Sequence, residues 1–278
     1  MTHTPSKTYH RALTIATSDS GGGAGTQADL KTFAALGCYG MSVLAALTAQ
    51  NTVEVRGIHA LPPEFVALQI DAVAEDLGID AVKIGMLFTA DIMKAVAGRL
   101  KAHHIGNIVL DPVMVAKSGA KLMEDDAIEA LKKHLFPLCI TVTPNRPEAE
   151  TLLGRKIRDK SEVEDAAREI LELGPRSVLL KGGHFSDEKS ADCLVLSEPD
   201  EHNRDVYWFE SERINTKNTH GTGCTLSSAI AAELAKGASL PTAVFRAKEY
   251  ISGAIKAAAN YRIGKGHGPL HHFYEVWE

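Results

Sequence analysis

Short apolar runs and longer amphipathic segments alternate along most of the chain. Residues 11–18 (RALTIATS) predict a buried β-strand, whereas residues 26–37 (TQADLKTFAALG) predict a helix that ends at a glycine. Residues 40–50 predict a second strand, and residues 63–77 place their apolar side chains on one helical face. This alternation of strand and helix is typical of α/β proteins.

Further β-branched runs follow, each ended by polar, glycine or proline residues, at 81–87, 107–113, 139–144 and 177–183. Strands this apolar predict a mainly parallel sheet with helices on both faces, which is a three-layer α/β/α sandwich. Two shorter runs, at 192–197 and 205–210, are joined by a polar segment and predict an antiparallel hairpin near one edge. Sheets of this kind bind ligands beyond the carboxyl ends of their strands.

Length, composition and charge indicate one domain and a small ligand. The chain has 278 residues, of which 45% are hydrophobic, and a formal net charge of −5 with both signs interspersed. It is long enough to bury a full core, and no linker interrupts the alternation. We therefore expect an N-terminal tail over residues 1–10 and a single domain over residues 11–278. Because no basic stripe follows the chain, nucleic acid is not an expected partner.

The sequence contains no signal for a membrane, a disulfide framework or a zinc site. No apolar run approaches the roughly 20 residues that span a bilayer, and residues 1–10 lack the plan of a signal peptide, so we expect a cytoplasmic protein. The pairs His103–His104 and His271–His272 are interpreted as solvated or capping side chains rather than metal ligands, because adjacent residues point apart. The cysteines are widely separated and contain no C-x-x-C pair: Cys38, Cys139, Cys193 and Cys224.

The segment SDSGGGAG (18–25) joins the first predicted strand to its helix. A dinucleotide-binding G-x-G-x-x-G that begins at Gly21 requires a glycine at position 26, where the chain has Thr26. The spacing therefore argues against a Rossmann fingerprint. These glycines either let the backbone approach a ligand closely or form a tight turn between strand and helix.

Polar residues collect where later strands end. Asp111 ends a strand in the segment LDPVM, and Asn145 and Glu148 follow another in TPNRPEAE. Hard oxygen groups of this kind bind Mg²⁺ together with waters and substrate phosphates, although each residue alone is more often a helix cap or a surface group. Their occurrence on successive strand ends favours the metal interpretation. Lys181, in LLKGGH, adds an ammonium group that could meet a nucleotide phosphate.

The segment NTHGTGCTLS (218–227) precedes a run of strong helix formers. At the start of this predicted helix lie the backbone amides of Gly221, Thr222, Gly223 and Cys224. A helix N-terminus binds anions and suits the charge that develops on a phosphoryl group in transfer. The same field predicts a lowered pKa for the Cys224 thiol, which could then accept a proton from an attacking hydroxyl. The simpler alternative is a small thiol packed beneath the helix.

These segments occur together with others in one order along the chain: GGAGTQADLKTF, TAQNT, KIGML, LDPVM, AKSG, TPNRPEA, KGGH and NTKNTHGTGCTLS. In that order they resemble the ribokinase superfamily, and within it the bacterial hydroxymethylpyrimidine and phosphomethylpyrimidine kinases of thiamine biosynthesis. The resemblance runs from about Ala12 to residues 264–273 (GKGHGPLHHF). Many superfamily members have aspartate where this chain has Cys224, and the cysteine is similar to the pyrimidine-kinase branch and its pyridoxal-kinase-like relatives. Several relatives have a Pro-Ser pair where this chain has SDSGGG, which keeps Asp19 and Gly25.

The resemblance implies an ATP- and Mg²⁺-dependent kinase, and a homodimer. Its implied reaction phosphorylates 4-amino-5-hydroxymethyl-2-methylpyrimidine and then the resulting monophosphate, with the turn from Gly221 to Cys224 serving both steps. It implies substrate contacts from Asp29, Gln50, Met86 and Val113. It places Asp111 and Glu148 near Mg²⁺, and Asn145, Lys181 and Thr216 along ATP. A glutamine amide and a carboxylate can satisfy the adjacent acceptor and donor of an aminopyrimidine.

Three alternatives remain open from the sequence. The nearest is a pyridoxal or pyridoxine kinase, since pyridoxine also carries a hydroxymethyl group on a flat nitrogen heterocycle. The others are a dinucleotide-dependent oxidoreductase and a nucleotide-binding regulator without turnover. The glycine spacing argues against the oxidoreductase. ATP consumption that rises when hydroxymethylpyrimidine is added would exclude the regulator.

Overall fold

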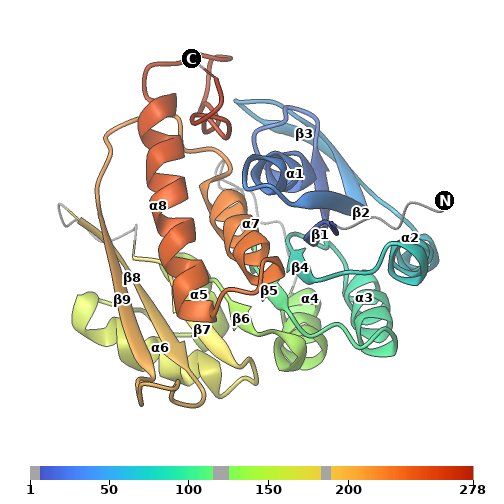
Figure 1. The fold of residues 1–278 in the computed structure, drawn as a ribbon, viewed down its shortest axis with the longest axis horizontal. Helices are drawn as coiled ribbons and strands as arrows, with labels where there is room; N and C mark the ends of the chain where they lie inside the picture. Colours follow the sequence, from blue (N-terminus) through green and yellow to red (C-terminus); the bar gives the residue numbers. More distant parts are fainter. Residues whose placement is uncertain (1–6, 115–124, 183–188, 278) are drawn as a thin grey trace.

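The computed structural model describes residues 7–114, 125–182 and 189–277. The strands of these residues form one nine-stranded sheet that crosses the middle of the molecule (Figure 1). Its order is β3-β2-β1-β4-β5-β6-β7-β8-β9. The strands are β1 (Arg11–Asp19), β2 (Tyr39–Gln50), β3 (Val55–Ala60), β4 (Ala81–Ile84), β5 (Ile108–Leu110), β6 (Thr141–Val142), β7 (Ser177–Leu180), β8 (Lys189–Leu196) and β9 (Val206–Glu212).

The central strands, from β2 to β7 in this order, are parallel. β3 pairs antiparallel at one edge, and β8 and β9 form an antiparallel hairpin at the other. From β1 the chain passes to β2 on one side, whereas from β4 it passes to β5 on the opposite side. The strand order therefore reverses between β1 and β4, which is where α/β sheets bind ligands beyond the carboxyl ends of their strands.

Helices cover both faces of the sheet and complete the three layers (Figure 1). One layer contains α1 (Gly25–Ala35), α7 (Thr222–Ala235) and α8 (Leu240–Ala258). The other contains α2 (Pro63–Asp76), α3 (Ala90–Ala102), α4 (Asp125–Ala130), α5 (Arg146–Leu153) and α6 (Val163–Leu171). Short turns of helix at Leu131–Leu135, Phe136–Leu138 and Lys160–Glu162 join the second layer.

Each face of the sheet has its own hydrophobic core. Ile15, Val43 and Ile84 point to the layer of α2 to α6, and all three are fully buried. Phe33 and Ile230 belong to the core on the opposite face, where α7 packs with many small residues and is buried along most of its length. Burying one such large apolar side chain contributes about 1.5–3 kcal/mol. The start of α7 is thereby held firmly against the sheet.

The predicted three-layer α/β/α architecture is confirmed, including the hairpin of β8 and β9. The strand predicted at 81–87 ends at Ile84. Position 85 suits glycine, because a Cβ atom there would lie 2.8 Å from Lys83 Nζ. The edge strand β3 was not predicted. The division into a tail over residues 1–10 and one domain stays a prediction, and residues 1–6 lie outside the described residues, as do 116–119 (AKSG) and the last two residues of KGGH.

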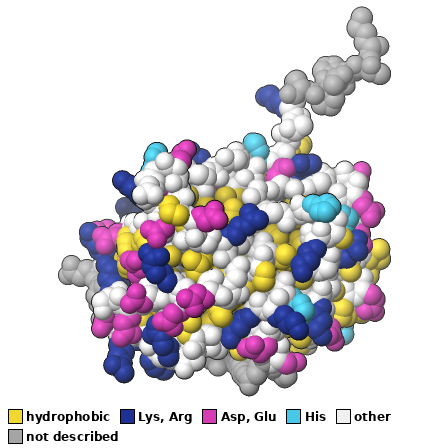
Figure 2. All heavy atoms as spheres, turned by 90° about the horizontal axis from the view of Figure 1, so that it is seen from below, with side chains coloured by type: hydrophobic (Ala, Val, Ile, Leu, Met, Phe, Trp, Pro, Cys, Tyr) yellow, Lys and Arg dark blue, Asp and Glu magenta, His cyan; other side chains and the backbone are white. Residues whose placement is uncertain are grey.

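Charged side chains of both signs are interspersed over the face shown in Figure 2. Among the described residues, none of the helices combines the length and the apolar character that crossing a membrane requires. The four cysteines are unpaired.

Candidate active site

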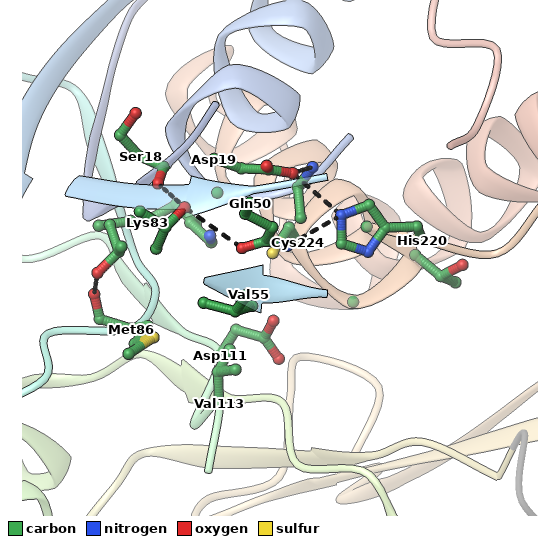
Figure 3. A pocket seen from close by; sticks show the side chains of 18 of the residues that line it. Ser18, Asp19, Gln50, Val55, Lys83, Met86, Asp111, Val113, His220 and Cys224 are labelled. Atoms are coloured by element: carbon green, nitrogen blue, oxygen red, sulfur yellow. Dashed lines mark hydrogen bonds and ion pairs between the residues drawn. The ribbon is translucent and has the colours of Figure 1, made fainter. Parts of the chain in front are cut away.

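A cavity of about 210 Å³ opens where the strand order reverses (Figure 3). Its wall combines the ends of β1 and β2, the segments that follow β4 and β5, and the first turn of α7. Its polar lining includes Ser18, Asp19, Thr48, Gln50, Lys83, Asp111, Glu148, Lys181, His220 and Cys224. Three of the four residues that the sequence assigns to the substrate also line it: Gln50, Met86 and Val113.

The turn before α7 has the backbone that its glycines predict. Gly221 is the N-cap residue with φ 84°, and a Cβ atom there would lie 1.9 Å from the carbonyl oxygen of Gly23. Only glycine fits this left-handed, tightly packed position. The N–H groups of a helix's first turn have no acceptor within the helix, and Thr222 and Gly223 line the cavity. The positive end of α7 therefore faces the cavity.

This turn lies close to a buried ion pair. A Cβ atom at Gly223 would be 3.1 Å from Asp111 Oδ2 and 3.3 Å from Lys181 Nζ. Lys181 Nζ donates to Asp111 Oδ1 at 2.8 Å. The sequence predicted that the anion-binding turn, Asp111 and Lys181 would gather at one site, and the structure brings these groups together.

Cys224 lines the cavity, but the acidity predicted for its thiol is wrong. Burial raises the pKa of its thiol to about 11, although the Lys83 ammonium and a hydrogen bond from the Gly25 amide both favour the thiolate. The helix end alone therefore does not decide the protonation state. At neutral pH the thiol keeps its proton until something else stabilises the thiolate.

Asp29, assigned to the substrate by the sequence, lies in the core and is not among the residues that line the cavity. Its carboxylate accepts hydrogen bonds from Thr14 Oγ1 at 2.6 Å, from Lys83 Nζ at 2.9 Å and from Ser228 Oγ at 2.7 Å. Lys83 is fully buried and does line the cavity. Burial would lower the Lys83 pKa, but Asp29, and to a lesser degree Cys224, raise it, so the ammonium stays charged.

Lys83 was missed because it lies inside the apolar run AVKIGML. A single lysine in a strand that is otherwise apolar is itself a signal, because a buried ammonium requires a partner. Asp19 and His220 also line the cavity without having been assigned a role from the sequence. So do Val55 and Ile58, which come from the unpredicted strand β3.

Asn145 and Glu148 form a capping box at the start of α5. The Asn145 side chain accepts from the Glu148 N–H at 3.0 Å, and Glu148 Oε2 accepts from the Asn145 N–H at 2.7 Å. Both residues also line the cavity, so the structural and the functional interpretations hold together. Burial, opposed by Lys181 and reinforced by Asp111, raises the Glu148 pKa to about 7. The carboxylates of Asp111 and Glu148 are the hard ligands that a divalent cation prefers.

A second cavity of about 330 Å³ adjoins the first. Both cavities are lined by Asn145, Lys181, Thr222 and Gly223. The second cavity is also lined by a buried ion pair between Lys248 and Asp192 at 2.6 Å, and by the apolar side chains of Ile214, Leu226, Ile251 and Ile255. Thr216 is not part of this lining, and its Oγ1 accepts from the Asn218 N–H at 3.1 Å.

The C-terminal segment packs against the start of α7. His272 Nε2 lies 3.0 Å from Thr225 Oγ1, and the Tyr250 hydroxyl donates to the His272 carbonyl oxygen at 2.8 Å. His272 is only 4% exposed, and burial lowers its pKa to about 4. The backbone N–H of His220 donates to the Gly268 carbonyl oxygen at 3.0 Å. The segment from 264 to 273 therefore packs against the turn as well as against α8.

A family model described as phosphomethylpyrimidine kinase matches residues 19–271. The chain is 49% identical over 267 residues to the hydroxymethylpyrimidine/phosphomethylpyrimidine kinase of Salmonella typhimurium, a match that covers 96% of this chain and 98% of that protein. It is 54% identical over 260 residues to the thiamine biosynthesis bifunctional protein ThiED of Geobacter sulfurreducens, which covers 94% of this chain but only 51% of that relative.

The fold is also shared with a solved structure. Bacillus subtilis pyridoxal kinase, in complex with ADP, matches with a TM-score of 0.85 and 37% sequence identity over 95% of this chain and 98% of that chain. The arrangement of layers, the sheet order and the glycine-rich turn at α7 therefore belong to a ribokinase-like kinase. Since the family model and the relatives extend over nearly the whole sequence, the chain belongs to the phosphomethylpyrimidine kinase family.

Proposed function

We propose that this protein transfers the γ-phosphoryl group of ATP to 4-amino-5-hydroxymethyl-2-methylpyrimidine, and then transfers a second one to the resulting monophosphate. The observation that carries the proposal is the junction of the two cavities, which share Asn145, Lys181, Thr222 and Gly223. A donor in one cavity and an acceptor in the other would meet at the positive end of α7. The names of the relatives support this reaction.

The first cavity suits a small, flat heterocycle. Met86, Val113 and Val55 supply apolar surface for the ring faces, and Gln50 supplies an amide that can pair with a polar ring edge. The hydroxymethyl group would then point toward Cys224 and the turn. The second cavity offers an apolar wall for a base and suits the nucleotide, a placement consistent with the ADP complex of the related pyridoxal kinase.

The donor set at the junction fits Mg²⁺. Asp111 and Glu148 are 2% and 7% exposed, and the Lys181 ammonium contacts the Asp111 carboxylate at 2.8 Å. Burial raises the Glu148 pKa to about 7 although Lys181 opposes it, so a bound cation would favour the ionised carboxylate. We propose that Asp111 and Glu148 hold Mg²⁺ through its waters, while Asn145 and Lys181 contact the nucleotide. Bound there, Mg²⁺ would neutralise charge on the phosphate oxygens.

Cys224 is proposed to take the proton of the substrate hydroxyl in the first step. The hydroxyl oxygen forms a bond to the γ-phosphorus as the bond from phosphorus to the bridging oxygen of ATP breaks, and the released proton passes to the thiolate. The resting thiol, which is partly exposed, must first release its own proton to solvent, and the Lys83 ammonium favours this release. The second acceptor is a phosphate monoester that is already ionised at neutral pH, so it requires no base.

A coupled assay with both pyrimidine substrates and with pyridoxine tests this function. We expect a higher kcat/KM for hydroxymethylpyrimidine than for pyridoxine, with mass spectrometry detecting the mono- and diphosphate of the pyrimidine. A preference for pyridoxine would instead make the chain a pyridoxal-type kinase, the second candidate that the Bacillus subtilis structure supports. ATP binding without any turnover would indicate a regulator.

The same family resemblance implies a homodimer, which we include in the proposal. Among the described residues, strand β3 is the edge strand of the sheet, and α2, which follows it along the chain, exposes Phe65 and Leu68. A second copy would cover this surface. Sedimentation velocity should then give the mass of a dimer, and a monomer at micromolar concentration would contradict this part.

A further inference from the structure

The imidazole of His220 connects the recognition side of the first cavity with the turn that begins α7. Its Nε2 atom lies 3.0 Å from Asp19 Oδ2 and 3.3 Å from Gln50 Nε2 (Figure 3). Gly221 follows it directly as the N-cap of α7. A shift of this ring would therefore reach both the Gln50 amide and the helix start.

The ring and its carboxylate partner are held in place by the backbone around them. A Cβ atom added to Gly23 would lie 2.5 Å from His220 Cδ2, so a side chain at this position would displace the imidazole. Asp19 Oδ1 accepts from the Gly21 N–H at 2.8 Å, and Asp19 Oδ2 accepts from the Ala24 N–H at 2.8 Å. These contacts fix the carboxylate and the ring relative to each other.

The Asp19 carboxylate decides which nitrogen of the ring carries a proton. Burial would raise the Asp19 pKa, but hydrogen bonds from His220, Gly21 and Ala24 outweigh burial and hold the pKa below its ordinary value. An ionised carboxylate only accepts hydrogen bonds. The nearby Nε2 atom of His220 must therefore carry the proton and donate it.

A protonated Nε2 has a consequence for Gln50. The amide nitrogen at 3.3 Å is also a donor, so two donors would face each other. On the other side of the amide, Thr48 Oγ1 lies 3.3 Å from Gln50 Oε1, but the one hydroxyl proton of Thr48 is already donated to the Ser18 carbonyl oxygen at 2.8 Å. A half turn of the amide relieves both contacts, because its nitrogen then donates to Thr48 Oγ1, while its oxygen shares the Nε2 proton of His220 with Asp19 in a three-centre hydrogen bond.

We propose that His220 is a positioning residue for substrate selection, which fixes the Gln50 amide with its oxygen toward His220 and its nitrogen toward Thr48. This proposal rests on the proposed function and deepens it. With one lone pair and one N–H engaged on these neighbours, the amide keeps one lone pair and one N–H for the substrate. Their order along the cavity wall is fixed, because turning the amide breaks both hydrogen bonds.

A fixed order separates the two competing substrates. An aminopyrimidine presents a ring nitrogen, which accepts, beside an exocyclic amine, which donates, and this edge pairs with an amide in one orientation only. Pyridoxine carries no such amine. An amide that turns freely adapts to either edge, whereas an amide held by His220 favours the aminopyrimidine and leaves a polar group unpaired on its rival.

Two substitutions of His220 test the proposal. His220→Phe keeps a ring of similar size but removes the donor, whereas His220→Gln keeps an N–H near the position of Nε2. We expect His220→Phe to raise KM for hydroxymethylpyrimidine roughly 10- to 100-fold, to leave KM for ATP unchanged, and to reduce the preference over pyridoxine. His220→Gln should recover most of both losses. His267→Phe, at an exposed histidine of the C-terminal segment, is the matched control and should leave both KM values unchanged.

A double-mutant cycle with Gln50→Ala separates positioning from a general structural role. If His220 acts through Gln50, His220→Phe adds little to the KM of the Gln50→Ala enzyme. Additive effects, or a fall in kcat with KM unchanged, would overturn the proposal.

Nitrogen NMR of the wild-type imidazole gives a readout that does not depend on activity. A proton on Nε2 supports the proposal, and a proton on Nδ1 alone overturns it. Failure of the proposed function is a separate result, because the wild-type enzyme would then not turn over hydroxymethylpyrimidine.

Discussion

Two lysine–aspartate pairs in this protein have almost the same length but different surroundings. Lys83 Nζ lies 2.9 Å from Asp29 Oδ2, and Lys181 Nζ lies 2.8 Å from Asp111 Oδ1. Both side chains of the first pair are 0% exposed, whereas those of the second are 13% and 3% exposed. Both pairs join a lysine ammonium to an aspartate carboxylate. Any difference in role must therefore come from their other hydrogen-bond partners and from their exposure to the cavity.

The remaining partners of each carboxylate differ. Asp29 also accepts from the hydroxyls of Thr14 and Ser228, so both of its oxygens are engaged within the core. Asp111 accepts from Lys181 and more weakly from Thr143 at 3.3 Å, and it lines the first cavity. Lys83 lines the first cavity but Asp29 does not, so the Asp29 end of this pair stabilises the fold. Asp111 and Lys181 both line that cavity and can exchange their partners for ligands.

The largest expected effect comes from breaking the pair of Lys83 and Asp29. Lys83→Met leaves the Asp29 carboxylate buried without its counter-charge, which should lower the free energy of unfolding by about 3–5 kcal/mol. Urea denaturation measures this loss. Adding Asp29→Asn to the same protein removes the uncompensated charge and should restore much of the stability. A single mutant as stable as the wild type would mean that the pair is not the structural element described here.

Breaking the pair of Lys181 and Asp111 should instead reduce activity more than stability. Lys181→Met should lower kcat about 100-fold or more, because it removes a positive charge from the phosphoryl-transfer junction. Its stability loss should be smaller than that of Lys83→Met, since Asp111 and Lys181 both line the first cavity and Lys181 is 13% exposed. Steady-state kinetics and urea denaturation on the same preparations check both parts. A stability loss as large as that of Lys83→Met would remove the distinction between the pairs.

His272 sharpens the comparison, because it is a buried titratable group whose hydrogen-bond partner is a hydroxyl, Thr225 Oγ1. Its pKa is lowered to about 4, so the unfolded chain takes up a proton near pH 6.5 while the folded protein does not. Stability from this group is present above pH 6.5 and is lost as the pH falls toward 4.

At pH 5 the stability lost through His272 amounts to about 2 kcal/mol, at roughly 1.4 kcal/mol for each unit of pKa. Denaturation at pH 7.5 and pH 5 should therefore show a steeper loss in the wild type than in His272→Gln. Equal losses in the two proteins would place the imidazole in contact with water.

The smallest expected effect concerns Glu148, whose carboxylate lies near Lys181 and Asp111. Glu148→Gln keeps the size of the side chain and removes its charge, so the Mg²⁺ concentration for half-maximal rate should rise several-fold, an effect on the order of 1 kcal/mol. Circular dichroism should still report a folded protein. An unchanged Mg²⁺ dependence would leave Glu148 with its role in the capping box of α5 alone.

The sequence predicted those parts of the fold that depend on local pattern. The apolar run of β1 and the glycine-rich start of α7 are local signals, and both elements form as expected. The edge strand Val55–Ala60 was not predicted because it is short and its apolar residues are interrupted by Arg56, Gly57 and His59. Val55 and Ile58 line the cavity. An edge strand needs less burial than a central one, so it leaves a weaker pattern.

The site was predicted less completely, because contacts between distant segments decide it. Asp29 lies on the buried face of α1, but its lysine partner is 54 residues away in the sequence. The depth of burial at Cys224 likewise depends on the packing of α7 against the sheet. A helix N-terminus is visible in the sequence, whereas the burial that outweighs it and raises the thiol pKa is visible only in the folded protein.

The most direct test of the account measures Cys224→Ala on the two phosphorylation steps separately. The account predicts that kcat for hydroxymethylpyrimidine falls by about 10²–10⁴-fold, the range typical of a lost general base, with little change in ATP binding. Phosphorylation of the monophosphate should fall much less, since that acceptor needs no base, and Cys224→Asp should restore part of the first activity. Equal losses in both steps would contradict a proton-accepting role for Cys224 and assign the residue to the shape of the turn.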